Sequence, residues 1–221
     1  MRTNYFLDHK LGEVLTSNPL QPKLAAMLTN VIGMTTPLIT GIINGAVTCM
    51  EGDEVYLEVG CCQGASLIGA LMGNDKRAVV VDNFSQFTGA CNLEAFEKNI
   101  RAHGVEERIA FYQEDSDHFF VNPPAMKVGV YYYDGDHGYN PTYDGIYAAI
   151  PHLVYGALIV VDDTNWDQPS LAIESLLHDK YDQSGKLELV FQVKTHDHPN
   201  LFWHNGLAIL TWNYDRCNKD A

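Results

Sequence analysis

Residues Val128–Trp166, VGVYYYDGDHGYNPTYDGIYAAIPHLVYGALIVVDDTNW, decide the fold of this chain. Two apolar runs in this stretch each end in paired carboxylates, Asp134-Gly135-Asp136 after the first and Asp162-Asp163 after the second. A helix-like segment lies between the runs, which indicates a strand–helix–strand unit with parallel strands. Because parallel strands end at the same edge of a sheet, where open α/β sheets bind ligands, we expect these acids to converge on one site.

Outside this stretch, short apolar runs alternate with helix-like segments, which indicates a parallel sheet with crossover helices. The expected upstream elements are strands over 54–59, 77–81 and 108–112 and helices over 66–72 and 93–103. Downstream, a helix over 170–178 precedes two strands, 187–193 and 207–212, which follow each other without a helix and must pair antiparallel. Residues 1–50 are interpreted as helices that cap the sheet, because no flexible linker follows them.

The composition is typical of one soluble α/β domain of 221 residues and disfavours some classes of ligand. The net charge is −14 and no Lys/Arg cluster stands out, whereas nucleic acids and anionic membranes require concentrated positive charge. We find neither an N-terminal signal sequence nor an apolar stretch long enough to span a bilayer. The five cysteines are odd in number and show no C-x-x-C spacing, which favours a reduced, cytoplasmic protein.

Residues 58–64, EVGCCQG, form a turn between the first expected strand and the first crossover helix. Glycine lets the backbone approach a ligand closely, and the start of a helix offers free N–H groups. The turn lacks the middle glycine of the dinucleotide-binding fingerprint, so an ordinary tight turn stays an alternative. The adjacent Cys61 and Cys62 are interpreted as small residues that fill this turn.

Polar residues also follow the second and third expected strands. Asp82 lies where an acid binds the ribose hydroxyls in dinucleotide-binding folds, although a helix cap explains an isolated acid equally well. Glu114, Asp115 and Ser116 could hydrogen-bond an adenine amine or belong to a surface loop. The combination is more informative than any single residue, because each of five successive strands ends in an acid or in the glycine turn.

This ordered set of motifs resembles the class I S-adenosylmethionine-dependent methyltransferases, over roughly Val55–Trp212. Within that class it is similar to the macrocin-type, metal-dependent O-methyltransferases of sugars and small molecules, which share a D-G-D-H motif. The matching segments are Glu58 to Gly64, Asp82-Asn83-Phe84, Asp134-Gly135-Asp136-His137 and Asp162-Asp163. The resemblance implies a single Rossmann-like domain over residues 1–221, with a helical cap (1–50) and a cofactor-binding core (51–221). It also implies a mostly parallel, seven-stranded sheet with an antiparallel last strand.

The resemblance assigns roles to the matching positions. S-adenosylmethionine would be bound by Glu58, Gly60, Gly64, Ser66, Asp82, Asn83, Asp115, Ser116 and Asp134. Asp134, Asp162 and Asp163 would hold a divalent metal, and Mg²⁺ is the expected ion because carboxylates with no softer ligand nearby favour a hard cation. Metal-free methyltransferases also carry acids at strand ends, so a metal-free site stays the alternative.

The remaining roles concern the reaction itself. Asp136 would be the general base that activates the acceptor hydroxyl. His137 is its rival, because an unperturbed histidine titrates near neutral pH. The helical residues before Val55 would cover the substrate pocket. The expected acceptor is a small hydroxylated molecule, with no nucleic-acid or membrane partner, and a homodimer is left open.

Two other functions stay open. One is an NAD-dependent oxidoreductase on a Rossmann-type sheet, although the missing glycine and the antiparallel last strand count against it. The other is a protein that binds the cofactor without catalysis. His196, His198 and His204, between the last two strands, could bind zinc. A polar loop explains these histidines as well, and the large apolar Phe202 and Trp203 favour a lid that contacts the substrate over a zinc site.

Overall fold

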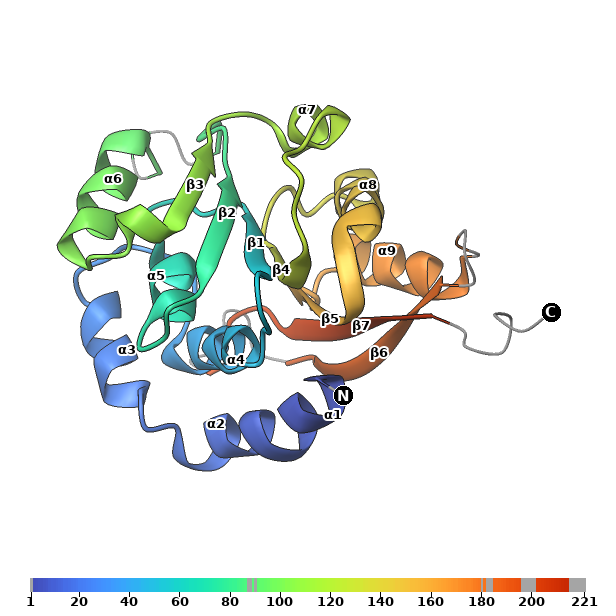
Figure 1. Cartoon of the computed structure of the whole chain (residues 1–221), viewed down its shortest axis with the longest axis horizontal. Coiled ribbons are helices and arrows are strands. Elements are labelled where there is room, and N and C mark those ends of the chain that lie inside the picture. Colours follow the sequence, from blue (N-terminus) through green and yellow to red (C-terminus); the bar gives the residue numbers. More distant parts are fainter. Residues whose placement is uncertain are drawn as a thin grey trace.

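A seven-stranded sheet forms the centre of the computed structural model, which describes residues 2–86, 89, 91–179, 181, 185–195 and 202–214 (Figure 1). The strands are β1 (Val55–Val59), β2 (Arg77–Val81), β3 (Ile109–Tyr112), β4 (Val128–Tyr133), β5 (Leu153–Asp162), β6 (Gly185–Val193) and β7 (Leu207–Tyr214). Their order is β3-β2-β1-β4-β5-β7-β6. Neighbouring strands are parallel except at β7, which runs antiparallel to both β5 and β6. The predicted mostly parallel sheet with an antiparallel last strand is confirmed.

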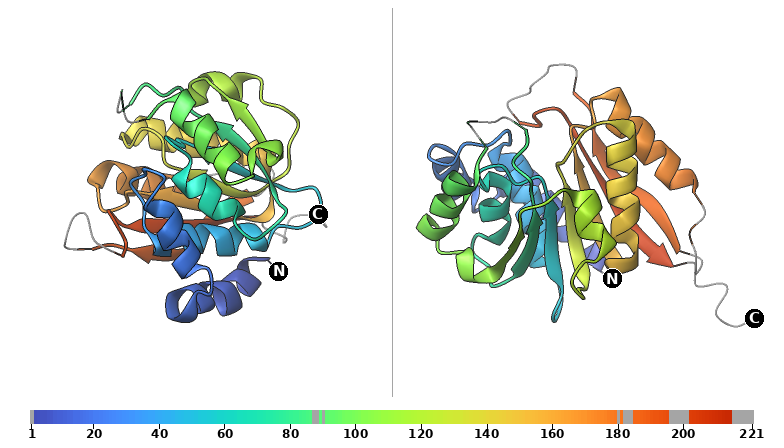
Figure 2. Two further views of the ribbon diagram at one scale, coloured as in Figure 1. Left: turned by 90° about the vertical axis from the view of Figure 1, so that its left-hand side faces the viewer. Right: turned by 90° about the horizontal axis from the view of Figure 1, so that it is seen from above.

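Helices cover both faces of the sheet (Figure 2). One face carries α1 (Arg2–Tyr5), the π-helical η1 (Phe6–Leu11), α2 (Gly12–Ser17), α3 (Gln21–Leu28), α4 (Pro37–Thr48), α5 (Ala65–Leu71) and α6 (Leu93–Ala102). The other face carries α7 (Ser116–Val121), α8 (Tyr139–Ala149) and α9 (Asp167–His178), and the short 3₁₀ turns η2 (Glu106–Arg108) and η3 (Ile150–His152) precede β3 and β5. The helix α7 was not predicted. Among the described helices, none has the length and apolar character needed to cross a membrane.

Strand β4 begins the stretch that decides the fold, and all six of its residues are buried. Successive side chains of a strand point to opposite faces, so Tyr132 joins one apolar core while Tyr131 and Tyr133 join the other. The Tyr132 hydroxyl donates to Asp134 Oδ2 at 3.2 Å, and the Tyr133 hydroxyl donates to the Asp136 carbonyl at 2.8 Å. The buried tyrosines thus hold the acidic loop that follows the strand.

The ends of the central strands are level with one another. Val59 at the end of β1 pairs with Val81 of β2 and with Tyr133 of β4, so the residues after these strands meet at one edge. The Asp134 N–H donates to the Val59 carbonyl at 2.9 Å. Gly60 has a φ of +85°, and a Cβ added to it would lie 2.0 Å from the Asp134 carbonyl oxygen. Only glycine allows this approach of the two backbones.

The N-terminal helices pack on one face of the sheet and contribute to the apolar core there. Asn44 of α4 is buried, and its Nδ2 donates to the carbonyls of Gly69 and Ala70 at 3.0 Å and of Met72 at 2.8 Å. Asn44 thereby ties α4 to the C-terminal end of α5. Among the described residues before Val55, Met34 alone lines the cavity at the sheet edge. Most of this segment packs on the face of the sheet, and its part in covering a substrate pocket stays a prediction.

Glu58 of β1 is a carboxylic acid with no exposed surface. The Tyr56 hydroxyl donates to its Oε2 at 2.7 Å, and the Ser66 hydroxyl donates to its Oε1. Burial raises the pKa of Glu58 to about 7, because these two hydrogen bonds only partly offset the loss of hydration and Asp82 adds repulsion. The ionised form is therefore disfavoured in the folded chain.

Replacing Gly60 with alanine is expected to destabilise the fold by at least ~3 kcal/mol, because the new methyl group must displace the Asp134 carbonyl at a left-handed φ. Gly104→Ala is the matched control, since Gly104 has a φ of +65° and nothing within 4 Å of an added Cβ. That variant is expected to lose only ~1–2 kcal/mol. Urea denaturation measures both values, and equal losses would contradict the contact.

Replacing Glu58 with glutamine is expected to change how stability depends on pH. Below about pH 4.5 the carboxyl is protonated in both the folded and the unfolded chain, so it adds no pH dependence. As the pH rises to about 7, the unfolded chain ionises first, and the wild type loses roughly 3 kcal/mol that Glu58→Gln keeps. Urea denaturation of both proteins between about pH 4 and 8 measures this loss; parallel stability curves are the result that would rule it out.

Candidate active site

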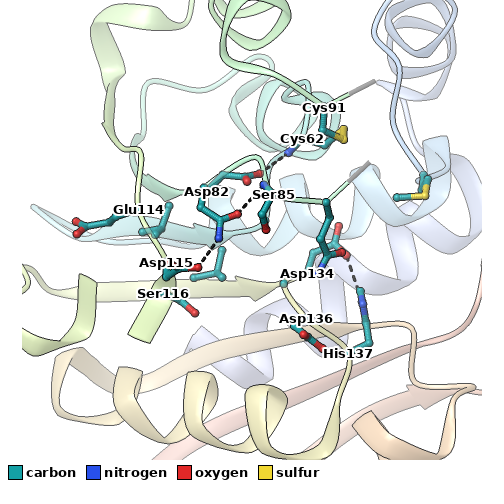
Figure 3. A pocket seen from close by; sticks show the side chains of 17 residues that line it. Cys62, Asp82, Ser85, Cys91, Glu114, Asp115, Ser116, Asp134, Asp136 and His137 are labelled. Atoms are coloured by element: carbon teal, nitrogen blue, oxygen red, sulfur yellow. Dashed lines mark hydrogen bonds and ion pairs between the residues drawn. A yellow bond between two sulfur atoms is a disulfide. The ribbon is translucent and has the colours of Figure 1, made fainter. Parts of the chain in front are cut away.

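A cavity of about 210 Å³ opens at the edge where β1, β2, β3 and β4 end (Figure 3). The predicted site residues that line it are Gly60, Asp82, Asn83, Asp115, Ser116, Asp134, Asp136 and His137. Five carboxylates line the cavity, and no lysine or arginine does in the part of the chain that the structure describes. A cavity of this charge attracts neutral or cationic molecules more readily than phosphates.

Three of the residues predicted to bind the cofactor, Glu58, Gly64 and Ser66, do not line this cavity. Glu58 and Ser66 hydrogen-bond to each other inside the core. Gly64 precedes α5 with a φ of +87°, and a Cβ there would lie 3.4 Å from the Phe96 ring of α6. These residues shape the glycine turn from within the fold.

Asp82 fastens the glycine turn to the end of β2. Its Oδ2 accepts the backbone N–H groups of Cys61 and Cys62, both at 2.8 Å, and its Oδ1 accepts the N–H of Phe84 at 2.7 Å. A carboxylate offers about four acceptor positions. Backbone donors therefore take three of these positions on Asp82.

The loops after β2 and β3 are joined by Asn83, whose Nδ2 donates to Asp115 Oδ1. Asp115 precedes α7, and Ser116 is the first residue of that helix. Since β3 and β4 lie on opposite sides of β1 and β2, Asp115 and Ser116 border the cavity on the side away from His137 (Figure 3). The predicted adenine-binding residues thus lie apart from His137 across the cavity.

Asp162 and Asp163, at the end of β5, are almost fully buried, with 2% and 7% of their surface exposed. Burial raises the pKa of Asp162, and the neighbouring Asp134 and Asp163 raise it further. Burial likewise raises the pKa of Asp134 well above its usual range, with Asp163 as the next cause. Closely spaced carboxylates make this part of the edge favourable for a cation.

His137 lies among these acids. Its Nε2 is 3.5 Å from Asp134 Oδ1 and 3.4 Å from Asp163 Oδ2, and its ring meets the Trp166 ring edge-on at 5.2 Å. Within the described chain, His137 Nε2 and the Oδ1 atoms of Asp162 and Asp163 are buried without a hydrogen-bond partner. Buried polar atoms of this kind are commonly satisfied by water or an ion.

The donors for a metal ion are present at this edge but are not assembled. Asp134, Asp162 and Asp163 offer the oxygen ligands that Mg²⁺ prefers. Considering the described residues only, no group of three or more His, Cys, Asp or Glu side chains is arranged to hold a metal ion. A metal at the predicted position would therefore require these side chains to move.

Asp136 differs from Asp134, Asp162 and Asp163 because it is exposed. The Gly138 N–H donates to Asp136 Oδ1 at 2.8 Å, and the Tyr133 hydroxyl holds the Asp136 carbonyl. The carboxylate lines the cavity, where it can accept a proton from a bound molecule. His137, in contrast, directs its Nε2 toward two carboxylates.

Cys62 and Cys91 form a disulfide on the wall of the cavity. The prediction of a reduced chain, with Cys62 as a filler of the turn, is therefore wrong for this pair. The two cysteines are 29 residues apart in sequence, but they follow the neighbouring strands β1 and β2. Other residues singled out in the sequence lie outside the described residues: His196, His198 and Cys217.

Several residues line the cavity without having been predicted: Met34, Val59, Cys62, Val81, Ser85, Gln86, Cys91 and Gly135. Ser85 and Gln86 directly follow the Asp82-Asn83-Phe84 motif in sequence, so their place in the cavity could have been predicted from their nearness to the end of β2. Met34 had no such signal, because its place depends on how α3 and α4 pack. The Thr36 hydroxyl near it donates to the Phe202 carbonyl at 2.6 Å, which ties this segment to the loop before β7.

Comparison with known proteins agrees with this layout. Residues 57–164 match the model of a family described as a methyltransferase domain. No curated protein matches the sequence. Cofactor-bound Rv0187 from MTB has a similar fold, with 17% identity and a TM-score of 0.63 over 95% of this chain and 97% of that chain.

Two O-methyltransferases are also similar. TomG from Streptomyces achromogenes, in complex with SAM, has 13% identity and a TM-score of 0.62 over 96% of this chain and 99% of that chain. An enzyme from Bacillus cereus, in complex with SAH, has 14% identity and a TM-score of 0.60 over 91% and 90%. Identities this low show the fold alone. In sequence, residues 57–164 match a methyltransferase domain, and in fold the chain is Rossmann-like and similar to O-methyltransferases.

Proposed function

We propose that this chain is an S-adenosylmethionine-dependent methyltransferase that methylates a hydroxyl group of a small molecule. The observation that carries the proposal is the layout of the cavity, in which the Gly60 turn and Asp82 lie beside the carboxylates that follow β4. The methyltransferase-domain match over residues 57–164 supports it. A similar fold in an O-methyltransferase solved in complex with SAM supports it further.

In this proposal the cofactor lies across the ends of β1, β2 and β3. Asp82, which lines the cavity, would accept a ribose hydroxyl, and Asp115 with Ser116 would bind the adenine. Gly60 lets the methionine part approach the backbone, and Asp134 faces its ammonium group. The cavity volume of about 210 Å³ is below the ~300–1,000 Å³ that encloses a typical ligand, so part of the cofactor lies in the open mouth.

Asp136 is the proposed base. The cofactor, when bound, would supply a methyl group on a sulfonium. Asp136 would take the proton of the acceptor hydroxyl as the oxygen gains the methyl group and the methyl–sulfur bond breaks. His137 is less suited to this role, because its Nε2 faces the carboxylates of Asp134 and Asp163. We assign His137 to positioning these two carboxylates. Holding the acceptor in line with the methyl group supplies much of the remaining acceleration.

Mg²⁺ is the proposed ion for Asp134, Asp162 and Asp163. The unpaired, buried Oδ1 atoms of Asp162 and Asp163 support this assignment, as do the raised pKa values that crowding contributes to. The ion would stabilise the negative charge that develops on the acceptor oxygen. The assignment requires the side chains to move, since their donors are not assembled.

The acceptor is proposed to be neutral or cationic. Five carboxylates line the cavity, and the described lining residues include no lysine or arginine to hold a phosphate. The same charge pattern disfavours nucleic-acid and anionic-membrane partners. No specific observation favours an NAD-dependent oxidoreductase over the proposed methyltransferase.

Replacing Asp82 with asparagine is expected to weaken S-adenosylmethionine binding about ten-fold or more, because one side-chain oxygen is lost from a hydrogen-bonded charged group. Asp136→Asn is the matched variant, because Asp136 is proposed to act in the reaction and not in cofactor binding. This substitution should leave the affinity for S-adenosylmethionine unchanged. Calorimetry with S-adenosylmethionine and with NAD measures both effects. Binding of NAD without binding of S-adenosylmethionine would contradict the proposed function.

Replacing Asp162 with asparagine is expected to abolish Mg²⁺ binding while leaving cofactor affinity within about two-fold, because Asp162 does not line the cofactor cavity. Asp144→Asn on the exposed side of α8 is the control and should bind Mg²⁺ like the wild type. Calorimetric titration with Mg²⁺ measures the change. A wild-type protein that binds no Mg²⁺, or whose methyl transfer is unaffected by EDTA, would remove the metal from the proposal.

A further inference from the structure

The Cys62–Cys91 disulfide lies where a change of redox state would reach the cavity. Both residues line it, and Figure 3 shows their bonded sulfurs on its wall. Their Cα atoms are 4.6 Å apart, within the range of about 4.4–6.8 Å for bonded cysteines. The backbone therefore already holds the two sulfurs in position to form or break the bond.

The disulfide and a hydrogen bond each join Cys62 to a residue beyond β2. The Cys62 N–H donates to Asp82 Oδ2 at 2.8 Å, and the Cys62 sulfur bonds to Cys91. Asp82 and Cys91 are thus both attached to Cys62. Asn83, Ser85 and Gln86 lie between them in sequence and line the cavity, so the disulfide restrains one wall of the site.

Helix α6 is attached to the glycine turn by other contacts. Asn99 Nδ2 donates to the Gln63 carbonyl at 3.0 Å, and the Phe96 ring packs against Gly64. The Asn92 side chain caps α6 by accepting the Ala95 N–H at 2.9 Å. Breaking the disulfide would leave these contacts in place, so its effect would fall on the wall that Asn83, Ser85 and Gln86 form.

The neighbouring thiol is unsuited to compete for the bond. Cys61 is buried, and burial together with Asp82 raises the pKa of its thiol well above the usual range. A thiol must lose its proton to attack a disulfide. Exchange at this site is therefore restricted to Cys62 and Cys91, which a small reagent reaches through the cavity that they line.

We propose that Cys62 and Cys91 form a reversible redox site that controls cofactor affinity. In the oxidation step, the Cys62 and Cys91 thiols lose two protons and two electrons to a low-molecular-weight disulfide. Its S–S bond breaks through a mixed-disulfide intermediate, two small thiols leave with the protons, and the Cys62–Cys91 bond forms. A low-molecular-weight thiol reverses the reaction.

The effect on affinity rests on the proposed function. The oxidised protein holds Asn83, Ser85 and Gln86 in place before the cofactor arrives. In the reduced protein the cofactor must order this wall as it binds, and that cost lowers its affinity. The oxidised form is therefore the tight-binding form, and reduction is expected to weaken binding about five- to ten-fold.

The first experiment follows the thiols without the cofactor. The full chain is equilibrated with mixtures of oxidised and reduced glutathione, its free thiols are alkylated, and its peptides are analysed by mass spectrometry. A Cys62–Cys91 peptide that appears and disappears reversibly supports the redox site. Two results would overturn the redox site. Cys62 and Cys91 could be free and become alkylated at every glutathione ratio, or no ratio could reduce their disulfide in the folded chain.

The second experiment compares S-adenosylhomocysteine binding to the oxidised and reduced chains by calorimetry. Cys91→Ser should bind like the reduced wild type at every redox state, and Cys61→Ala, which keeps the pair, should still respond to reductant. Thermal unfolding checks that each protein is folded, and the reduced wild type provides the comparison if Cys91→Ser is not. Equal, measurable affinities overturn the redox control alone. Absence of binding in both states overturns the proposed function and the affinity effect, while the thiol measurement still decides whether the pair is redox-active.

Discussion

The approach of Gly60 to the Asp134 carbonyl is the constraint on which the site depends. An added Cβ would lie 2.0 Å from that oxygen, so β1 and β4 can end level with each other only when this position has no side chain. The Tyr132 and Tyr133 hydroxyls then hold the loop that begins at Asp134. Without this close pairing, the glycine turn and the acidic loop would not border one cavity.

The same alignment brings carboxyl groups together at a cost in stability. Glu58, Asp134 and Asp162 all have raised pKa values, and burial is the largest cause in each case. Hydrogen bonds reduce part of this cost, because hydroxyl groups donate to Glu58 and Asp134. Groups with such perturbed pKa values tend to cluster at functional sites.

Much of the fold could be predicted from periodicity alone. The strand–helix alternation and the helix-free link between the last two strands predicted the mixed sheet, because these patterns depend on local sequence and on burial. The meeting of Gly60, Asp82 and Asp134 at one cavity follows from the same topology. Three features could not be predicted: the Cys62–Cys91 bond, the burial of the Glu58 side chain in the core and the position of Met34. They depend on loop paths and packing, which the order of the elements does not encode.

The negative lining of the cavity is also expected to bind the cofactor differently before and after the proposed reaction. The methyl donor carries a positive sulfonium, whereas the product that remains after transfer is neutral at sulfur. Five carboxylates along the wall attract the charged form more strongly than the neutral one. The acidic cavity would therefore favour exchange of the spent cofactor for a fresh one, and this preference would weaken as salt screens the charges.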